Sequence, residues 1–270
     1  MIKKQNPKDK FTKERTPLIV EKLSKIYDDG TVAVKELSFK LHDGEILGLI
    51  GPNGAGKTTT LKCLMNLVEP SEGEIRIKGF PAGTREAKAS IAYIPEIPIL
   101  YNDLTVREHL KFVTMAYRVP EKKALERIDR LLKEFDLQNR ESETPINFSK
   151  GMRKKVSIIC ALVHNAQVFL IDEPFTGLEP RAVQTLKNSI LTAKEAGMSV
   201  LFSTHILDMA EKICDKFLIL QNGIKIAEGS MRELRALAGF QNRKETTLED
   251  IFIALTEPVL REPQAEGKDQ

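Results

Sequence analysis

Residues 51–59, GPNGAGKTT, have the types and the spacing that a loop around a phosphate group needs. They fit the pattern G-x-x-x-x-G-K-[ST], in which glycines let several backbone N–H groups approach one anion closely. An apolar run, EILGLIG, leads into the loop and a helical pattern follows it, so a glycine-rich turn with a chance lysine explains the segment less well. The helix that starts near Lys57 would add its positive end at the same place.

This loop predicts a site for a nucleotide and Mg²⁺. We expect Lys57 to reach the β- and γ-phosphates and the hydroxyl of Thr58 to bind the metal. The residues of the loop that we expect to contact the nucleotide are Gly51, Pro52, Asn53, Gly54, Ala55, Gly56, Lys57, Thr58 and Thr59.

Two carboxylates stand where the apolar run VFLID, a predicted strand, ends. Parallel sheets gather ligands beyond the carboxyl ends of their strands, so Asp172 is a candidate metal ligand, directly or through water. Glu173 points the other way and is a candidate general base that positions water. A solvated turn is the simpler alternative for both. His205 ends the similar run SVLFSTH and could hydrogen-bond a γ-phosphate, although a lone histidine is more often a surface or packed residue.

The segments around these residues alternate between strand and helix, which predicts an α/β fold with a largely parallel sheet. Short antiparallel strands are expected before the loop, and Asn222-Gly223 predicts a late hairpin. Helices are expected at 57–68, at 105–135 with a break at Pro120, and at 149–163, 180–196 and 206–214. The predicted organisation is a basic tail at 1–16, a core at 17–256 with a helical insertion at about 97–165, and a polar, mobile tail at 257–270.

Composition restricts the remaining possibilities. With 270 residues, 41% of them hydrophobic, the chain can bury one substantial core and a small subdomain. A net charge of +3 gives no argument for binding nucleic acid. The longest apolar stretch, 156–171, is interrupted by polar residues, so we expect no membrane-spanning helix. Cys63, Cys160 and Cys214 lack metal-ligand spacing and are expected to be buried thiols of a reducing compartment.

The segment FSKGM at 148–152, followed by a helical pattern, resembles the signature motif of ABC-type ATPases, whose common form is LSGGQ. It lies between the phosphate loop and the strand acids, which is the order in that family. The resemblance implies a P-loop NTPase core of ABC type, in which Ser149 and Gly151 meet the γ-phosphate of a nucleotide bound by a second subunit. Donors at the N-terminus of the following helix suit this role. ATP would then join two subunits head to tail, most simply as a homodimer.

Other positions match this family residue by residue. Tyr27 takes the place of an aromatic residue that stacks on adenine, with a stray core or surface tyrosine as the alternative. Glu96 takes the place of a glutamine that senses the metal and contacts the membrane partner, and residues 177–180 take that of a loop that communicates across the dimer. The segments YIPEIPILYNDLT, FSKGMRKKVSIIC and STHILDMAEKICD are similar to ATP-binding subunits of Ecs-type bacterial transporters.

The sequence departs from the family pattern at Glu96, Lys150, Met152 and Glu179. A carboxylate at 96 can still hold metal or water but cannot donate a hydrogen bond. Lys150 either adds positive charge near the phosphate or faces solvent. None of these changes removes the loop lysine, the metal acid or the base, so the resemblance implies an active ATPase.

The resemblance also implies a function: an ATP-hydrolysing subunit of an ABC transporter, peripheral on the cytoplasmic face of the membrane, that drives a separate transmembrane permease subunit. The apolar PILY at 98–101 either docks that subunit or packs inside the helical insertion. A soluble ABC-type ATPase acting on ribosomes or chromosomes is the alternative, but such proteins usually carry two ATPase cassettes or long coiled coils. A metabolic P-loop kinase would leave FSKGM, Glu173 and His205 unexplained. No nucleic-acid partner is expected.

Overall fold

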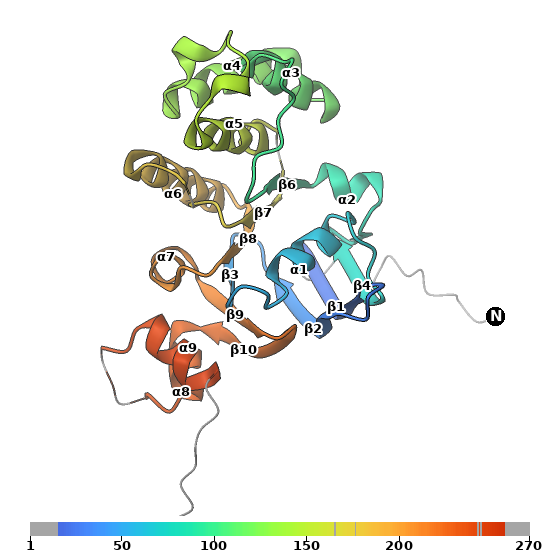
Figure 1. The fold of residues 1–270 in the computed structure, drawn as a ribbon, viewed down its shortest axis with the longest axis vertical. Helices are drawn as coiled ribbons and strands as arrows, with labels where there is room; N and C mark the ends of the chain where they lie inside the picture. The colour runs from blue at the N-terminus through green and yellow to red at the C-terminus, as the bar shows by residue number, and fades with distance from the viewer. Residues whose placement is uncertain (1–15, 165, 176, 242, 244, 257–270) are drawn as a thin grey trace, which may run out of the picture.

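The computed structural model describes residues 16–256 except 165, 176, 242 and 244. In this part of the chain two β-sheets with their covering helices form the body of the molecule, and a group of helices stands at one end (Figure 1). The tails predicted at 1–16 and 257–270 lie outside the described residues, apart from residue 16.

The larger sheet has six strands in the order β10-β9-β3-β8-β7-β6. They are β3 (Ile46–Ile50), β6 (Ile91–Ile94), β7 (Val168–Asp172), β8 (Ser199–Thr204), β9 (Lys216–Gln221) and β10 (Ile224–Ser230). All neighbours pair in parallel except β9 and β10, which form the predicted hairpin with positive φ at Asn222 and Gly223. β3, β7 and β8 are buried at every position, which explains their largely apolar sequences.

The smaller sheet confirms the predicted antiparallel unit near the N-terminus. Its strands run in the order β2-β1-β4-β5, where β1 is Leu18–Ile26, β2 is Val32–Leu41, β4 is Glu72–Ile77 and β5 is Phe80–Pro81. Leu23 of β1 and Leu37 of β2 pack in one cluster with Leu49 of β3 and with Leu61 of α1 (Lys57–Leu64). This shared core fixes the small sheet against the loop that leads into α1.

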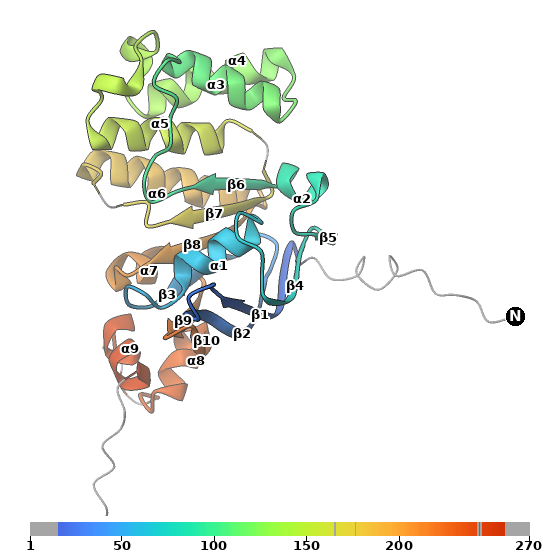
Figure 2. The same cartoon turned by 45° about the vertical axis from the view of Figure 1, so that its right-hand side comes forward.

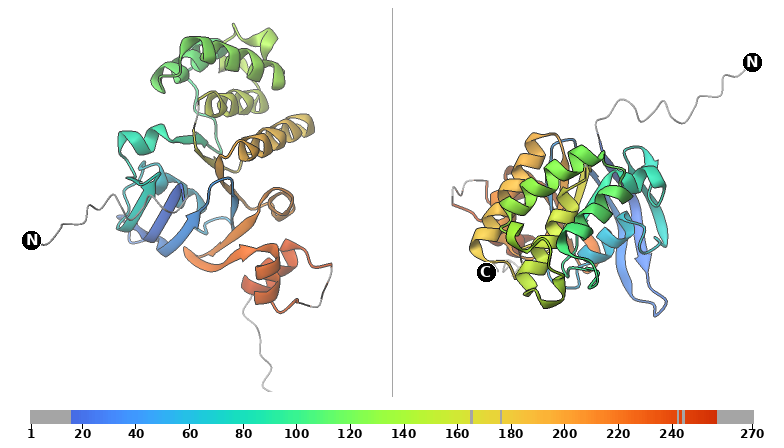
Figure 3. Two further views of the ribbon diagram at one scale, coloured as in Figure 1. Left: turned by 180° about the vertical axis from the view of Figure 1, so that it is seen from behind. Right: turned by 90° about the horizontal axis from the view of Figure 1, so that it is seen from above.

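Three helices between β6 and β7 confirm the predicted helical subdomain: α3 (Val106–Ala116), α4 (Glu121–Glu134) and α5 (Lys150–Leu162). Single 3-10 turns, η2 (Gln138–Arg140) and η3 (Pro145–Asn147), join α4 to α5. The views in Figures 1, 2 and 3 agree that α5 lies between the α3–α4 pair and the rest of the fold. Apolar side chains on α3 and α4 pack in one cluster with side chains of α5 and β7, including Val106, Leu110, Ile128, Leu131, Ile159 and Phe169.

The remaining helices are α2 (Arg85–Ala89), α6 (Pro180–Glu195), α7 (Leu207–Ile213), α8 (Met231–Leu237) and α9 (Leu248–Thr256). Of these, α6 and α7 were expected from the sequence, whereas α2, α8 and α9 were not, although a capping box of Ser230 and Glu233 starts α8. The helix expected at 57–68 is shorter than predicted. The helix ends at Leu64 because Asn66 takes a left-handed conformation with φ +54.

Two further expectations can be compared with the structure. Cys63, Cys160 and Cys214 are free thiols; Cys63 is buried and the other two are partly buried. Within the described ranges, no helix combines the length and the hydrophobicity that a membrane crossing needs.

Candidate nucleotide-binding site

The loop between β3 and α1 requires glycine at two positions. Gly56 has φ +98, and a Cβ added to it would overlap the carbonyl oxygen of Ala33. A Cβ on Gly51 would overlap the carbonyl oxygen of Leu220. Only glycine fits at both places, so these two glycines of the motif are required by the close approach of neighbouring backbone carbonyls. The helix α1 begins directly after the loop and directs its N-terminal end toward it.

The ammonium group of Lys57 is buried among oxygen atoms. Its Nζ donates hydrogen bonds to the carbonyl oxygens of Gly51 at 2.8 Å and Pro52 at 3.2 Å. The Oε1 atom of Glu173 lies 3.7 Å from Nζ. Burial lowers the pKa of Lys57, and the charges of Glu173 and Asp172 act in the opposite direction. The loop and the end of β7 therefore meet where the sequence predicts the terminal phosphates.

Glu173 follows β7 with φ +42, a conformation that costs a non-glycine residue on the order of 1–3 kcal/mol. Its backbone N–H donates to the carbonyl oxygen of Ser203 at 3.1 Å. Its Oε2 accepts from the hydroxyl of Thr204 at 3.2 Å, and its Oε1 lies 2.8 Å from Nδ1 of His205. The end of β8 thus holds both the main chain and the carboxylate of Glu173.

Asp172 is 1% exposed, and its Oδ1 accepts from the hydroxyl of Ser203 at 2.8 Å. Tyr93, on β6, carries a second hydroxyl group near Asp172. Burial chiefly, and then the negative charge of Asp172, raise the pKa of the Tyr93 phenol well above its ordinary value. Tyr93 and Ser203 were not among the site residues predicted from the sequence. Only their position could have indicated a role, because each stands near the carboxyl end of a strand beside β7.

A hollow of about 420 Å³ opens beside these groups. It is lined by Tyr27, Thr31, Val32, Ala33, Asn53, Gly54, Ala55, Gly56, Lys57, Thr58, Thr59, Glu96, Glu173 and His205. Most residues assigned to the nucleotide from the sequence therefore share one concave surface. Tyr27 stands beside the loop, with its phenol oxygen 3.3 Å from Oγ1 of Thr59. Asp172, Ser149 and Gly151 are not among the lining residues.

Ser149 and Gly151 stand at the start of α5. Ser149 is exposed and caps the helix, because its Oγ accepts the N–H of Met152 at 3.3 Å. Lys150 is exposed as well. A Cβ on Gly151 would lie 3.2 Å from the carbonyl oxygen of Gly177, so this helix end packs against the loop that follows Glu173. Ser149 and Lys150 are thus accessible to another molecule, whereas Phe148 is buried and Met152 packs partly against the core.

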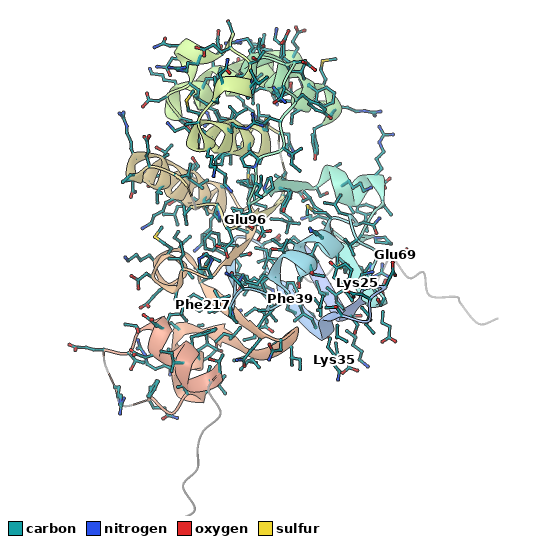
Figure 4. All side chains as sticks on the ribbon, viewed as in Figure 1. Lys25, Lys35, Phe39, Glu69, Glu96 and Phe217 are labelled. Atoms are coloured by element: carbon teal, nitrogen blue, oxygen red, sulfur yellow. The ribbon has the colours of Figure 1, made fainter. Side chains whose placement is uncertain are left out.

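Glu96 follows β6 and is exposed in the middle of the molecule, below the helical end (Figure 4). Its carboxylate, that of Asp172 and the hydroxyl of Thr58 are hard oxygen donors of the kind Mg²⁺ prefers. Across the residues with described positions, no three His, Cys, Asp or Glu side chains gather into a metal site of their own. Mg²⁺ commonly binds through one or two carboxylates plus substrate phosphates, so this donor set fits a metal shared with a nucleotide.

Sequence comparison agrees with this arrangement. Residues 34–176 match the protein family described as ABC transporter. The chain is 43% identical over 225 residues to the ABC-type transporter ATP-binding protein EcsA of Bacillus subtilis, which covers 83% of this chain and 90% of that protein. It is 37% identical over 204 residues to the SkfA peptide export ATP-binding protein SkfE of the same organism, covering 76% and 85% of the two chains.

Solved structures show the same relationship. The fold is similar to that of an ATP-binding subunit of an ABC transporter, with a TM-score of 0.85 and 40% identity over 90% of this chain and 100% of that one. It is also similar to CbiO1 from Clostridium perfringens, which is part of the ABC transporter complex CbiONQ, with a TM-score of 0.70 and 28% identity over 83% and 92% of the chains. The chain belongs to the ABC transporter ATP-binding family. The resemblance to Ecs-type subunits is confirmed.

Proposed function

We propose that this chain hydrolyses Mg²⁺·ATP at the hollow beside residues 51–59 and that hydrolysis drives a separate transmembrane subunit. The observation that carries the proposal is the convergence of Lys57, Glu173 and His205 beside one glycine-dependent loop. A phosphate-binding cation, a carboxylate and an imidazole at one strand edge are the groups that phosphoryl transfer to water requires.

Each of these residues has a role in the proposed reaction. Lys57 exchanges its loop carbonyl partners for the β- and γ-phosphates. Glu173 orients the attacking water, and His205 holds the Glu173 carboxylate and reaches toward the γ-phosphate. Thr58 and Asp172, with Glu96 at the rim, would hold Mg²⁺, whose positive charge would offset that of the phosphates. Tyr27 stacks on the adenine.

The site is completed by a second copy of the chain. Ser149 and Gly151 lie at an exposed helix start and outside the hollow, so they are free to donate to a nucleotide bound by another subunit. The N-terminus of the 13-residue helix α5 adds its positive end to those donors. A head-to-tail dimer then has two equivalent sites.

The membrane partner docks on an exposed apolar patch beside Glu96. The patch consists of Ile97, Ile99, Tyr101, Phe112 and Met115, which are between 52% and 88% exposed. The rings of Tyr101 and Phe112 meet edge to face at 5.8 Å, so the segment after Glu96 and helix α3 form one surface. A patch of this kind fits an apolar segment of a membrane protein. We place the chain, accordingly, at the cytoplasmic face of the membrane.

The sequence left open whether PILY docks or packs inside. Exposure differs along this segment: Ile99 is 88% and Tyr101 61% exposed, whereas Leu100 packs partly against the core. We therefore assign Ile99 and Tyr101 to the proposed docking surface and leave Leu100 out of it.

Replacing the proposed base tests the assignment of hydrolysis. Glu173→Gln keeps the shape of the side chain and removes the carboxylate, so kcat for Mg²⁺·ATP hydrolysis is expected to fall about 100-fold or more. ATP affinity should stay within a few fold. Glu195→Gln, at the exposed end of α6, makes the same chemical change far from the hollow and serves as the control. Equal turnover by the two variants would show that Glu173 is not the base.

A further inference from the structure

Lys154, on the second turn of α5, is a buried ammonium group that the proposed chemistry leaves without a role. Its residue is 2% exposed. Nζ donates to the carbonyl oxygens of Pro95 at 2.7 Å, Glu96 at 2.7 Å and Glu173 at 3.4 Å. An ammonium group has three N–H donors, so these three carbonyls match its full donor capacity. Buried lysines are rare without such partners.

The three carbonyls belong to two functional segments. Pro95 and Glu96 lie in the segment that leads from β6 to the apolar docking patch. Glu173 carries the proposed base. Lys154 itself stands one turn after the FSKGM residues on α5. One side chain therefore joins the helix that would meet the second subunit, the segment that would meet the membrane partner, and the residue that would orient water.

The hydrogen bond from Lys154 to the carbonyl oxygen of Glu173 acts on a residue whose backbone is already constrained. Glu173 has φ +42, and its N–H is fixed by the carbonyl oxygen of Ser203. Lys154 contacts the carbonyl on the other side of the same residue. A shift of α5 would therefore pull on the main chain that sets the direction of the carboxylate. Gly151, one turn earlier, already packs 3.2 Å from the carbonyl oxygen of Gly177, beyond Glu173.

Three carbonyl oxygens around Nζ use the three N–H donors of a charged ammonium group, so the geometry itself favours the protonated side chain. Lys154 does not line the hollow, so it can affect the main chain of Glu173 without touching a nucleotide in the same subunit.

We propose that Lys154 is a positioning residue that couples the segment at 95–96 and helix α5 to the orientation of Glu173. This inference rests on the proposed ATPase function. Lys154 sets the rate of hydrolysis and leaves nucleotide affinity unchanged, because its three bonds fix main-chain atoms around the base.

The test compares Lys154→Met, Lys154→Gln and Lys155→Met in the full chain. Methionine keeps the length and loses all N–H donors, whereas glutamine keeps two. Lys155 is the matched control: it is the next residue on α5, is half-buried, and its ammonium has no hydrogen bond or ion pair with the described residues. The measurements are Kd for a fluorescent ATP analogue, the number of binding sites, and kcat per binding site.

We expect kcat per site to fall at least tenfold in Lys154→Met, to be intermediate in Lys154→Gln and to be unchanged in Lys155→Met, with Kd within threefold throughout. If Lys154→Met does not fold, its binding sites disappear and the Lys154→Gln comparison decides. The inference is overturned if Lys154→Met and Lys155→Met turn over equally, if kcat and affinity fall in parallel, or if glutamine restores nothing. A wild-type chain that binds ATP without hydrolysing it would contradict the proposed function first.

Discussion

At the scale of single residues, the main feature of the site is that several acceptor groups lie around the ammonium group of Lys57. Its ammonium is bound by two carbonyls of its own loop and faces the carboxylate of Glu173 at 3.7 Å. A nucleotide offers stronger, charged acceptors for the same donors. In the proposed reaction, binding would release Lys57 from the loop and leave Glu173 with its partners Thr204 and His205, which would fix the carboxylate for a water.

Removing the ammonium group of Lys57 should weaken the binding of ATP and not only slow its hydrolysis. In Lys57→Ala, the affinity for ATP is expected to fall at least tenfold, since the charge that meets the β- and γ-phosphates is lost. Equilibrium binding of a fluorescent ATP analogue measures the effect. Lys62→Ala changes an exposed lysine on the same helix and should bind as the unchanged chain does. An unaltered Kd in Lys57→Ala would remove the lysine from the phosphate site.

The residues proposed to carry out the chemistry could be predicted from the sequence, because that chemistry requires particular side chains. Lys57, Glu173 and His205 were predicted and lie together. Lys154 was not, because its partners are backbone carbonyls, which every residue has. Tyr93 was not predicted for another reason: its position near Asp172 depends on which strands are neighbours in the sheet.

At the scale of elements, the strand ends position the chemistry. Asp172 and Ser203 are register partners of β7 and β8, so the acid and its hydroxyl donor meet at one sheet edge. Long apolar periodicities predicted α3, α4 and α6 correctly in type and approximate extent. The helix α2 is too short to show such a periodicity. The end of α1 depends on the left-handed backbone conformation of Asn66, which residue type alone does not determine.

A buried histidine just after α5 should make the free energy of unfolding depend on pH. His164 is 4% exposed and stacks on Tyr117 with ring centroids 3.7 Å apart. Burial, and then the charge of Arg127, lower the pKa of His164 to about 4, from about 6.5 in an unfolded chain. Arg118 and Lys123, which line the cavity at this ring, add positive charge on the same side.

Between these two pKa values the unfolded chain binds a proton at His164 that the folded chain does not. The free energy of unfolding should therefore fall as pH falls from about 6.5 to 4, with this residue contributing up to about 3 kcal/mol. Urea unfolding at several pH values measures the slope. In His164→Gln the slope over this window should be smaller. An identical slope in both proteins would mean that His164 is not buried in its neutral form.

At the scale of the whole molecule, three surfaces are made of different residues. The hollow lies at the edge of the central sheet, the FSKGM residues lie at the start of α5, and the apolar patch, which begins beside Glu96, extends from Ile97 to α3. The proposed assembly with a second copy and a membrane partner would use all three. The sequence predicted this assembly through family resemblance, but the extent of the patch needed coordinates, because Phe112 and Met115 join it from another element.

The patch predicts a specific loss of membrane attachment. Replacing Ile99 and Tyr101 together by serine should release the chain from membranes of cells that naturally produce it, since the apolar contact with the partner is lost. ATP binding should persist. Leu237→Ser alters a similarly exposed side chain on α8, at the opposite end of the molecule, and should leave attachment intact (Figure 1). Equal sedimentation of all three proteins with membranes would contradict this docking surface.

The most direct test of the shared ATP site is the mass of Glu173→Gln in solution with and without nucleotide. Slow hydrolysis should preserve ATP between two copies, so light scattering should give twice the mass of one chain with Mg²⁺·ATP and a single chain's mass with ADP. A protein that binds ATP and retains a single chain's mass at every concentration would contradict the claim that a second copy completes the site.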